Sequence, residues 1–287
     1  MAVRVIEGTT DVIKTLYANG CSFTEGKELE EEDPELRLAG SSKDIKTQLL
    51  VRDYRNKKAW PSHLGKLLGV DTVINAGRSG GSNARAVRMT YDYVCSYLAA
   101  GGEADELLVC LGFTDLVRTE RFESMPGVDV RSDAPFDDGW GLMKTNLSPQ
   151  KHGADRAALR ANKLYYRHLF REEQATVTFV HQILNMQFAL SSMGVRFHFH
   201  DALATNAEPI ARFPLLTQHL LRFIRPGVHR SVYSLGNGEM GFKDGHTFEE
   251  WLVRSGAPRA SAQHPLSEAH QLWATLLHSE MKESGIV

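Results

Sequence analysis

The chain has 287 residues, with 33 Lys and Arg against 35 Asp and Glu, 42% hydrophobic residues and 24% charged residues. This composition is typical of a globular protein and excludes disordered and fibrous chains. A net charge of -2 and a pI near 6.6 provide no basic field for a phosphate backbone. A small-molecule ligand is therefore favoured over a nucleic acid.

The cysteines and the first residues indicate a compartment. Cys21, Cys95 and Cys110 form no C-x-x-C pair, so neither a disulfide framework nor a structural zinc site is expected. Charged residues interrupt residues 1–20, which argues against a signal peptide, and no run approaches the roughly 18 apolar residues that span a bilayer. We expect a cytoplasmic protein with no membrane partner and no cofactor, whose oligomeric state the sequence leaves open.

The first part of the chain predicts a strand and a polar loop. Residues 11–18 are apolar and lead into Asn19-Gly20, where glycine can take the tight turn at a strand end. The acidic run over residues 28–35 has no apolar stripe and contains Pro34. It predicts a solvated loop rather than a metal site.

The next elements alternate between helix and strand. Residues 60–68 predict a short helix closed by Gly69, and residues 71–75 predict a strand. Ser82 is a plausible N-cap for a helix whose apolar positions recur every three or four residues as far as Gly101.

The remaining elements continue the alternation. The apolar run 106–111 predicts a strand buried on both faces, and residues 159–190 predict a helix that breaks near residues 175–178. Residues 195–200 alternate like a strand, and residues 267–282 carry an apolar helical face.

This order predicts an α/β fold, a flavodoxin-like three-layer α/β/α sandwich with a central parallel sheet. The chain shows no linker, so we expect a single domain over residues 1–287. Two stretches, at about 118–158 and 203–262, are longer than ordinary connections and rich in Pro, Gly and polar residues. We interpret them as insertions at the rim of the sheet and as candidate lids.

Three clusters of small residues follow three predicted strands, at residues 20–23, 75–83 and 112–115. Ligands of such sheets bind beyond the carboxyl ends of the strands, so the clusters should converge. A serine on a tight turn, with backbone amides nearby and a histidine from elsewhere in the chain, provides what acyl transfer requires.

These segments resemble the SGNH (GDSL-type) hydrolase family, block by block and in the family's order. The matching segments are Gly20-Cys21-Ser22-Phe23, Asn75 to Asn83, Gly112-Phe113-Thr114-Asp115, and His264-Pro265 before the last helix. Each block alone is a weak signal, but their order and their places at strand ends and a helix start are more specific.

The resemblance implies roles for these residues. Ser22 would be the nucleophile and His264 its base, with the amides of Ser22 and Gly80 and the Thr114 hydroxyl as oxyanion donors. Cys21, Asn83 and Asp115 would shape or support the substrate site.

Two positions depart from the family pattern. The usual acid lies three residues before the histidine, where this chain has Ser261, so Ser261 itself, a backbone carbonyl, Asp244 or Asp201 could orient His264. Thr114 replaces the usual Asn, and the shorter reach of its hydroxyl could weaken the oxyanion site.

Each of these residues also has a structural interpretation. Ser22 could cap a helix, and His264 could simply precede Pro265. His246, with Asp244, is the main rival of His264. His198 and His200 share one face of a strand and could hold a metal with Asp201, but we assign no metal because no further ligand motif accompanies them.

The predicted function is that of a serine esterase acting on a small ester through an acyl-Ser22 intermediate, with carbohydrate and natural-product esters as candidates. An acyltransferase using the same site is one alternative. The other is a catalytically weakened relative that binds a ligand or a partner.

Overall fold

A four-stranded parallel sheet forms the centre of the protein in a computed structural model, which describes residues 12–37, 44–122, 140–143, 156–203, 206–234, 240–242 and 246–287. The strand order is β2-β1-β3-β6. The strands are β1 (Thr15–Asn19), β2 (Thr72–Asn75), β3 (Leu107–Phe113) and β6 (Arg196–Asp201). β1 and β3 are the inner strands and are completely buried, as their continuous apolar sequences require.

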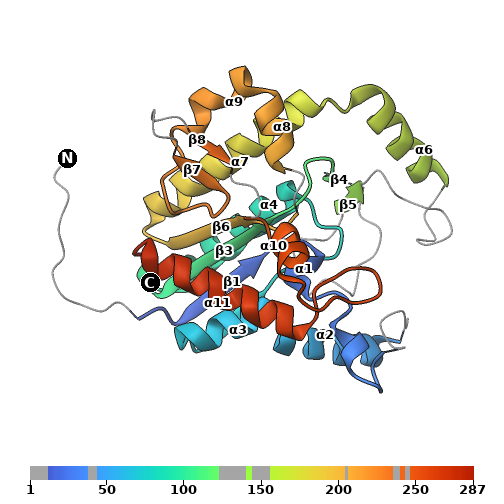
Figure 1. The fold of residues 1–287 in the computed structure, drawn as a ribbon, viewed down its shortest axis with the longest axis vertical. Coiled ribbons are helices and arrows are strands. Elements are labelled where there is room, and N and C mark those ends of the chain that lie inside the picture. The colour runs from blue at the N-terminus through green and yellow to red at the C-terminus, as the bar shows by residue number, and fades with distance from the viewer. Residues whose placement is uncertain are drawn as a thin grey trace.

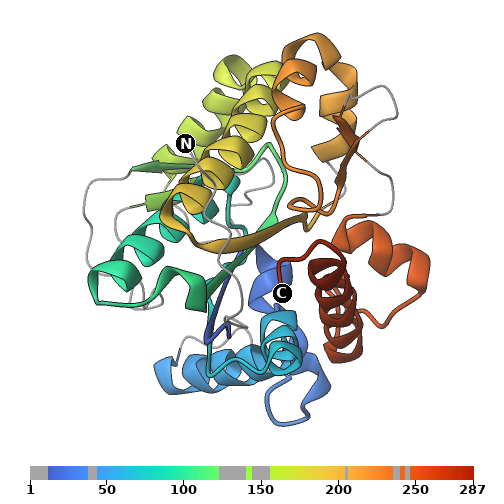
Figure 2. The ribbon, with the colours of Figure 1, turned by 90° about the vertical axis from the view of Figure 1, so that its left-hand side faces the viewer.

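Helices cover both faces of this sheet (Figures 1 and 2). α3 (Trp60–Leu68) and α11 (Ser267–Glu283) pack on one face, where Leu16 and Leu108 contribute to the core. α4 (Asn83–Ala99) and α7 (Glu172–Met193) pack on the other, against Tyr17 and Val109. The predicted three-layer α/β/α arrangement is confirmed.

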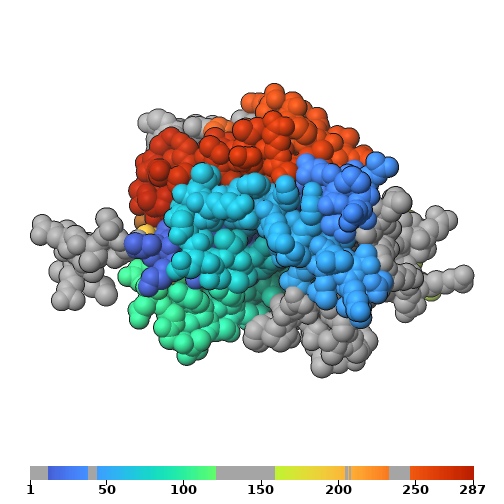
Figure 3. Space-filling model, turned by 90° about the horizontal axis from the view of Figure 1, so that it is seen from below, coloured from blue at the N-terminus to red at the C-terminus, as the bar shows by residue number. Residues whose placement is uncertain are grey.

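The N-terminal and C-terminal parts of the chain meet in one layer. Figure 3 shows the blue segment that contains α2 (Ile45–Lys58) and α3 packed beside the red C-terminal segment. Trp60 and Leu64 of α3 share a buried cluster with Trp273 and Leu277 of α11. The first and last thirds of the sequence therefore form one core.

Shorter elements complete the described chain. They are α1 (Ser22–Glu25), η1 (Leu29–Glu32), η3 (Ala104–Glu106), β4 (Thr119–Phe122), β5 (Trp140–Met143), α6 (Arg156–Leu164), η4 (Tyr165–Leu169), α8 (Ala207–Arg212), α9 (Pro214–Leu221), β7 (Val232–Ser234), β8 (Met240–Phe242) and α10 (Phe248–Ser255). The hairpins β4-β5 and β7-β8 lie within the two stretches predicted as insertions. The limits of the insertions and the single domain stay predictions.

Local chemistry sets several helix ends where the sequence predicts them. The Ser82 hydroxyl accepts a hydrogen bond of 3.1 Å from the Arg85 amide and caps α4. Gly69, with a φ of 68°, closes α3 in the left-handed conformation that glycine favours.

The long helical segment breaks earlier than predicted. Phe170 and Arg171 have extended backbones and separate the π-helical turn η4 from α7, whereas residues 175–178 are helical. Thr176 fits this helix because its hydroxyl donates to the Glu172 carbonyl over 2.8 Å. None of the described helices has the length and apolar character needed to cross a membrane.

Candidate active site

The turns after β1, β2 and β3 lie against one another. The Arg78 amide donates to the Gly20 carbonyl over 3.1 Å, and the Asn75 side chain donates to the Thr24 carbonyl over 2.9 Å. A β-carbon at Gly20 would lie 2.6 Å from the Gly112 carbonyl oxygen, so only glycine allows this approach. The three clusters of small residues therefore meet at the carboxyl edge of the sheet.

Ser22 occupies the first position of α1, directly after the turn that ends β1. The residue is 8% exposed, and its backbone carbonyl accepts from the amides of Gly26 and Lys27. Cys21, the preceding residue, is completely buried in the core with Ala18 and Trp60, as a packing residue would be. Ser22 therefore stands on a fixed turn with its side chain at the edge of the core.

Two backbone amides beside this turn have no acceptor in the part of the chain that the structure describes. Among the described residues, neither the Ser22 amide nor the Gly80 amide donates a hydrogen bond. Gly80 has a φ of 78°, a conformation that other residues rarely adopt. Such open donors at a turn are suited to an anionic oxygen.

Asn83 connects the second and third of these turns. Its side-chain oxygen accepts from the Thr114 amide over 2.7 Å, and its side-chain nitrogen donates to the Thr114 carbonyl over 2.9 Å. Asp115 stabilises the next turn by accepting from the Val117 amide over 3.0 Å. Asn83 and Asp115 thus hold the backbone on which Thr114 lies.

His264 lies on the segment before α11 and pairs with Glu28. Its Nδ1 is 3.0 Å from Glu28 Oε2, and its ring meets the ring of Phe23 edge to face, with centroids 5.7 Å apart. The side chains of His264 and Glu28 are 21% and 14% exposed. The contact therefore places His264 against the residue that follows Ser22.

The second ring nitrogen of His264 is open. Within the described part of the chain, His264 Nε2 has no hydrogen-bond partner, and no hydrogen bond joins it to Ser22 Oγ. In the tautomer that carries its hydrogen on Nδ1, the ring donates to Glu28 and Nε2 is the nitrogen that can accept a proton. The Glu28 carboxylate favours this tautomer, which is the one that a general base requires.

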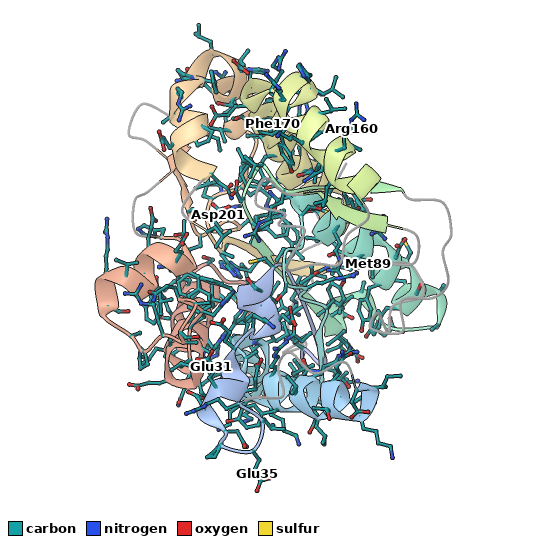
Figure 4. The ribbon with its side chains drawn as sticks, turned by 90° about the vertical axis from the view of Figure 1, so that its right-hand side faces the viewer. Glu31, Glu35, Met89, Arg160, Phe170 and Asp201 are labelled. Atoms are coloured by element: carbon teal, nitrogen blue, oxygen red, sulfur yellow. The ribbon has the colours of Figure 1, made fainter. Side chains whose placement is uncertain are left out.

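Two of the groups proposed to orient His264, Ser261 and Asp201, form their hydrogen bonds elsewhere. The Ser261 hydroxyl donates instead to Glu31 over 2.7 Å, and Asp201 accepts from Asn206 over 2.9 Å. Figure 4 shows Glu31 beside the C-terminal segment. Asp244 lies outside the described residues. The carboxylate that contacts His264 is that of Glu28, which was not among the residues proposed from the sequence.

The acidic run is not the solvated loop that the sequence predicts. Glu28, Glu31 and Glu32 accept from backbone amides of the segment 261–267, at distances of 3.2, 3.1 and 2.9 Å. Glu30 is buried and forms an ion pair with Arg55. Each of these carboxylates thus holds another segment, and three of them hold the segment that carries His264.

The backbone is strained on both sides of the Glu28–His264 contact. Glu28 and Gln263, the neighbour of His264, each have a φ of 72°, and they are the non-glycine residues with positive φ in the described chain. Side chains disfavour this conformation, and strain of this kind concentrates at functional sites. Both strained residues belong to the contact that orients His264.

Four other histidines are buried around β6. They are His198, His200, His229 and His270, each no more than 1% exposed. Burial lowers the pKa of His198, His229 and His270 to about 3 and that of His200 well below its usual range. These imidazoles are therefore neutral. No cluster suited to a metal ion is present in the described ranges.

Asp201 lies among these histidines, with its Oδ2 3.8 Å from His229 Nε2. Complete burial raises the pKa of Asp201 to about 7, against the lowering effect of its hydrogen bond with Asn206. The carboxyl of Asp201 therefore changes its protonation near neutral pH inside the protein. Cys110 is likewise buried, and burial raises the pKa of its thiol.

A cavity of about 650 Å³ lies at the opposite edge of the sheet. Arg196 and Phe197 at the start of β6 line it, together with Arg225 and the last residues of the chain. Because the strands are parallel, this edge is remote from Ser22, and the cavity contributes nothing to the candidate site.

Comparison with known proteins identifies a family. The model of a family of unknown function, DUF6071, matches residues 41–286. The chain belongs to this family. No curated protein matches it in sequence. Membership of this family assigns no activity to the chain.

Two solved structures are similar over most of the chain, each at 14% identity. One is a carbohydrate esterase described as having divergent catalytic and non-catalytic binding functions in its active site; the match covers 95% of this chain and 70% of that one, with a TM-score of 0.39. The other is mannonate dehydratase from Streptococcus suis serotype2, for which the match covers 95% of this chain and 96% of that one, with a TM-score of 0.27. At these scores neither similarity assigns a function.

Proposed function

We propose that the protein is a serine-dependent ester hydrolase that acts on a small ester through an acyl-Ser22 intermediate, as its resemblance to SGNH hydrolases implies. The observation that carries this proposal is the Glu28–His264 pair, set against the first turn of the helix that begins with Ser22. A carboxylate on Nδ1 fixes the imidazole tautomer and stabilises the imidazolium that forms when Nε2 takes a proton.

In the first step, His264 Nε2 removes the proton of Ser22 as Ser22 Oγ bonds to the ester carbonyl carbon. The carbonyl π electrons move to its oxygen, which the Ser22 and Gly80 amides and the Thr114 hydroxyl stabilise. The carbonyl then re-forms, the bond to the alcohol breaks, and the imidazolium of His264 returns a proton to the leaving alkoxide.

In the second step, water loses a proton to His264 and attacks the acyl-Ser22 carbonyl. Collapse of the intermediate releases the carboxylic acid and restores the Ser22 hydroxyl. An acceptor alcohol in place of water would make the same site an acyltransferase, because the acyl-enzyme is common to both reactions.

A panel of p-nitrophenyl esters of increasing acyl length tests this proposal. We expect release of p-nitrophenol by the wild-type protein, and a loss of about 10⁴-fold or more in Ser22→Ala. Adding alcohol acceptors distinguishes hydrolysis from acyl transfer, because transfer yields a new ester. Equal rates for the wild-type protein and Ser22→Ala would contradict the proposal.

A second candidate is a protein that binds a ligand or a partner without turnover. The absence of a Ser22–His264 hydrogen bond within the described chain favours this alternative, as does threonine at position 114. Catalytic hydrogen bonds often tighten only when substrate binds, so the open Nε2 remains compatible with catalysis. Binding of an ester without its hydrolysis would support the alternative.

A further inference from the structure

Thr114 and Arg118 form a contact that the sequence does not indicate. Arg118 Nη1 donates to Thr114 Oγ1 over 2.9 Å. Thr114 is 2% exposed, and its backbone is held on both sides by Asn83. The hydroxyl oxygen therefore has a fixed position at the carboxyl edge of β3.

The direction of this hydrogen bond decides where the hydroxyl hydrogen can go. Arginine carries only donors, so the Thr114 hydrogen cannot point to Arg118. Within the described residues it has no other acceptor. The hydrogen is therefore available to a bound molecule.

Arg118 brings a positive charge close to the Thr114 hydroxyl. Among the residues that the structure describes, no carboxylate forms an ion pair with Arg118, although Asp115 lies three residues earlier. The Asp115 carboxylate accepts instead from the Val117 amide. The guanidinium is half-buried, where its field is screened less than it would be in water.

We propose that Arg118 is a positioning residue that orients the Thr114 hydroxyl and strengthens it as a donor to the oxyanion formed at Ser22. This inference rests on the proposed function. A hydroxyl that accepts from a charged donor is polarised and becomes a stronger donor. The positive charge also favours the negative charge that develops in the transition state more than the neutral ester.

The test compares Arg118→Ala and Arg118→Lys with the wild-type protein on p-nitrophenyl acetate, which carries no charge. We expect kcat to fall about 10- to 100-fold in Arg118→Ala, with little change in KM, and to recover in part in Arg118→Lys. Guanidinium ion at tens of millimolar should restore part of the rate of Arg118→Ala. A purely structural role would not give this rescue.

A double-mutant cycle tests whether Arg118 affects the rate through the Thr114 hydroxyl. In a Thr114→Val background, Arg118→Ala should have almost no further effect, because the hydroxyl through which it acts is absent. Unfolding midpoints of all the variants show whether they fold.

Two results would overturn the inference while leaving the proposed function intact. The first is an Arg118→Ala variant that hydrolyses p-nitrophenyl acetate at the wild-type rate. The second is an Arg118→Ala variant in which KM rises only for esters that bear a carboxylate. Arg118 would then bind the negative charge of the substrate rather than orient Thr114. A wild-type protein that neither turns over esters nor reacts at Ser22 would instead refute the proposed function.

Discussion

The protein holds its histidines in two contrasting environments. His264 is partly exposed, has a carboxylate on Nδ1 and leaves Nε2 open, whereas His198 and His200 are buried and their ring nitrogens have no hydrogen-bond partner among the described residues. Burial without an acidic partner keeps an imidazole neutral, but a carboxylate stabilises the imidazolium. His198 and His200 lie on a strand of the sheet, but within the described chain they lack both the exposure of His264 and a carboxylate partner. A carboxylate partner and partial exposure therefore distinguish the histidine that is suited to proton transfer.

Among the variants that test this contrast, His264→Asn should lose the most activity. Loss of the base should lower the rate of Ser22 acylation about 10⁴-fold or more, because serine alone is a weak nucleophile. The measurement is single-turnover release of p-nitrophenol. His278→Asn, on α11 away from Glu28, is the control and should react at the wild-type rate. Equal loss in both variants would show that the effect is on folding.

Glu28→Gln is expected to have the next largest effect. The amide introduced by this substitution can still contact Nδ1 of His264 but cannot stabilise the imidazolium, so kcat/KM should fall about 10²- to 10⁴-fold. Glu31→Gln is the matched control, because Glu31 holds the same segment through Ser261 rather than through the histidine. If both variants lose the same activity, the acidic run only positions the segment and Glu28 has no role as an acid.

The buried histidines predict how stability depends on pH. Their pKa values lie below those of the unfolded chain, so between about pH 6.5 and pH 3 the unfolded state binds more protons and stability falls as pH falls. Asp201 has the opposite effect: because its pKa is raised in the folded protein, it increases stability as pH falls from about 7 to about 4. With four imidazoles against one carboxyl, we expect a net loss of stability in acid.

His200→Phe should reduce this pH dependence. Removing one buried imidazole lowers the slope of the unfolding free energy against pH by up to about 1.4 kcal/mol per pH unit below pH 6. Urea unfolding between pH 4 and pH 7 measures the slope, with His181→Gln as an exposed control. An unchanged slope would mean that His200 is not neutral in the folded protein, and the contrast with His264 would lose its basis.

The architecture was predictable because local sequence determines most of it. Alternating apolar runs and helical periodicity predict the strands of the sheet and the helices that cover it, and capping chemistry predicts the start of α4 at Ser82. The convergence of the glycine-rich turns also follows from parallel strands. These features depend on residues close together in the sequence or on general rules of topology.

The partner of His264 was not predictable in the same way. Glu28 and His264 are separated by 236 positions, and Glu28 lies in an acidic run whose composition is that of a solvated loop. Nothing in the pattern distinguishes Glu28 from Glu31 or Glu35. Serine at position 261 was the available signal, since it left the role of the usual acid open to another group, including a carboxylate from elsewhere in the chain.

Arg118 was missed for a related reason. It falls at the start of a stretch predicted as an insertion, and only the fold of the turn after β3 brings its guanidinium back to Thr114. Loop residues of this kind carry no periodic signal. The proposed function therefore depends on contacts made by the segments that sequence patterns describe least well.

Reaction with a fluorophosphonate probe, followed by intact-mass and peptide analysis, determines whether Ser22 is the nucleophile. We expect a single adduct on Ser22 in the wild-type protein, none in Ser22→Ala, and slow labelling in Glu28→Gln. An unmodified wild-type protein, or an adduct that persists in Ser22→Ala, would contradict the assignment of Ser22 as the nucleophile.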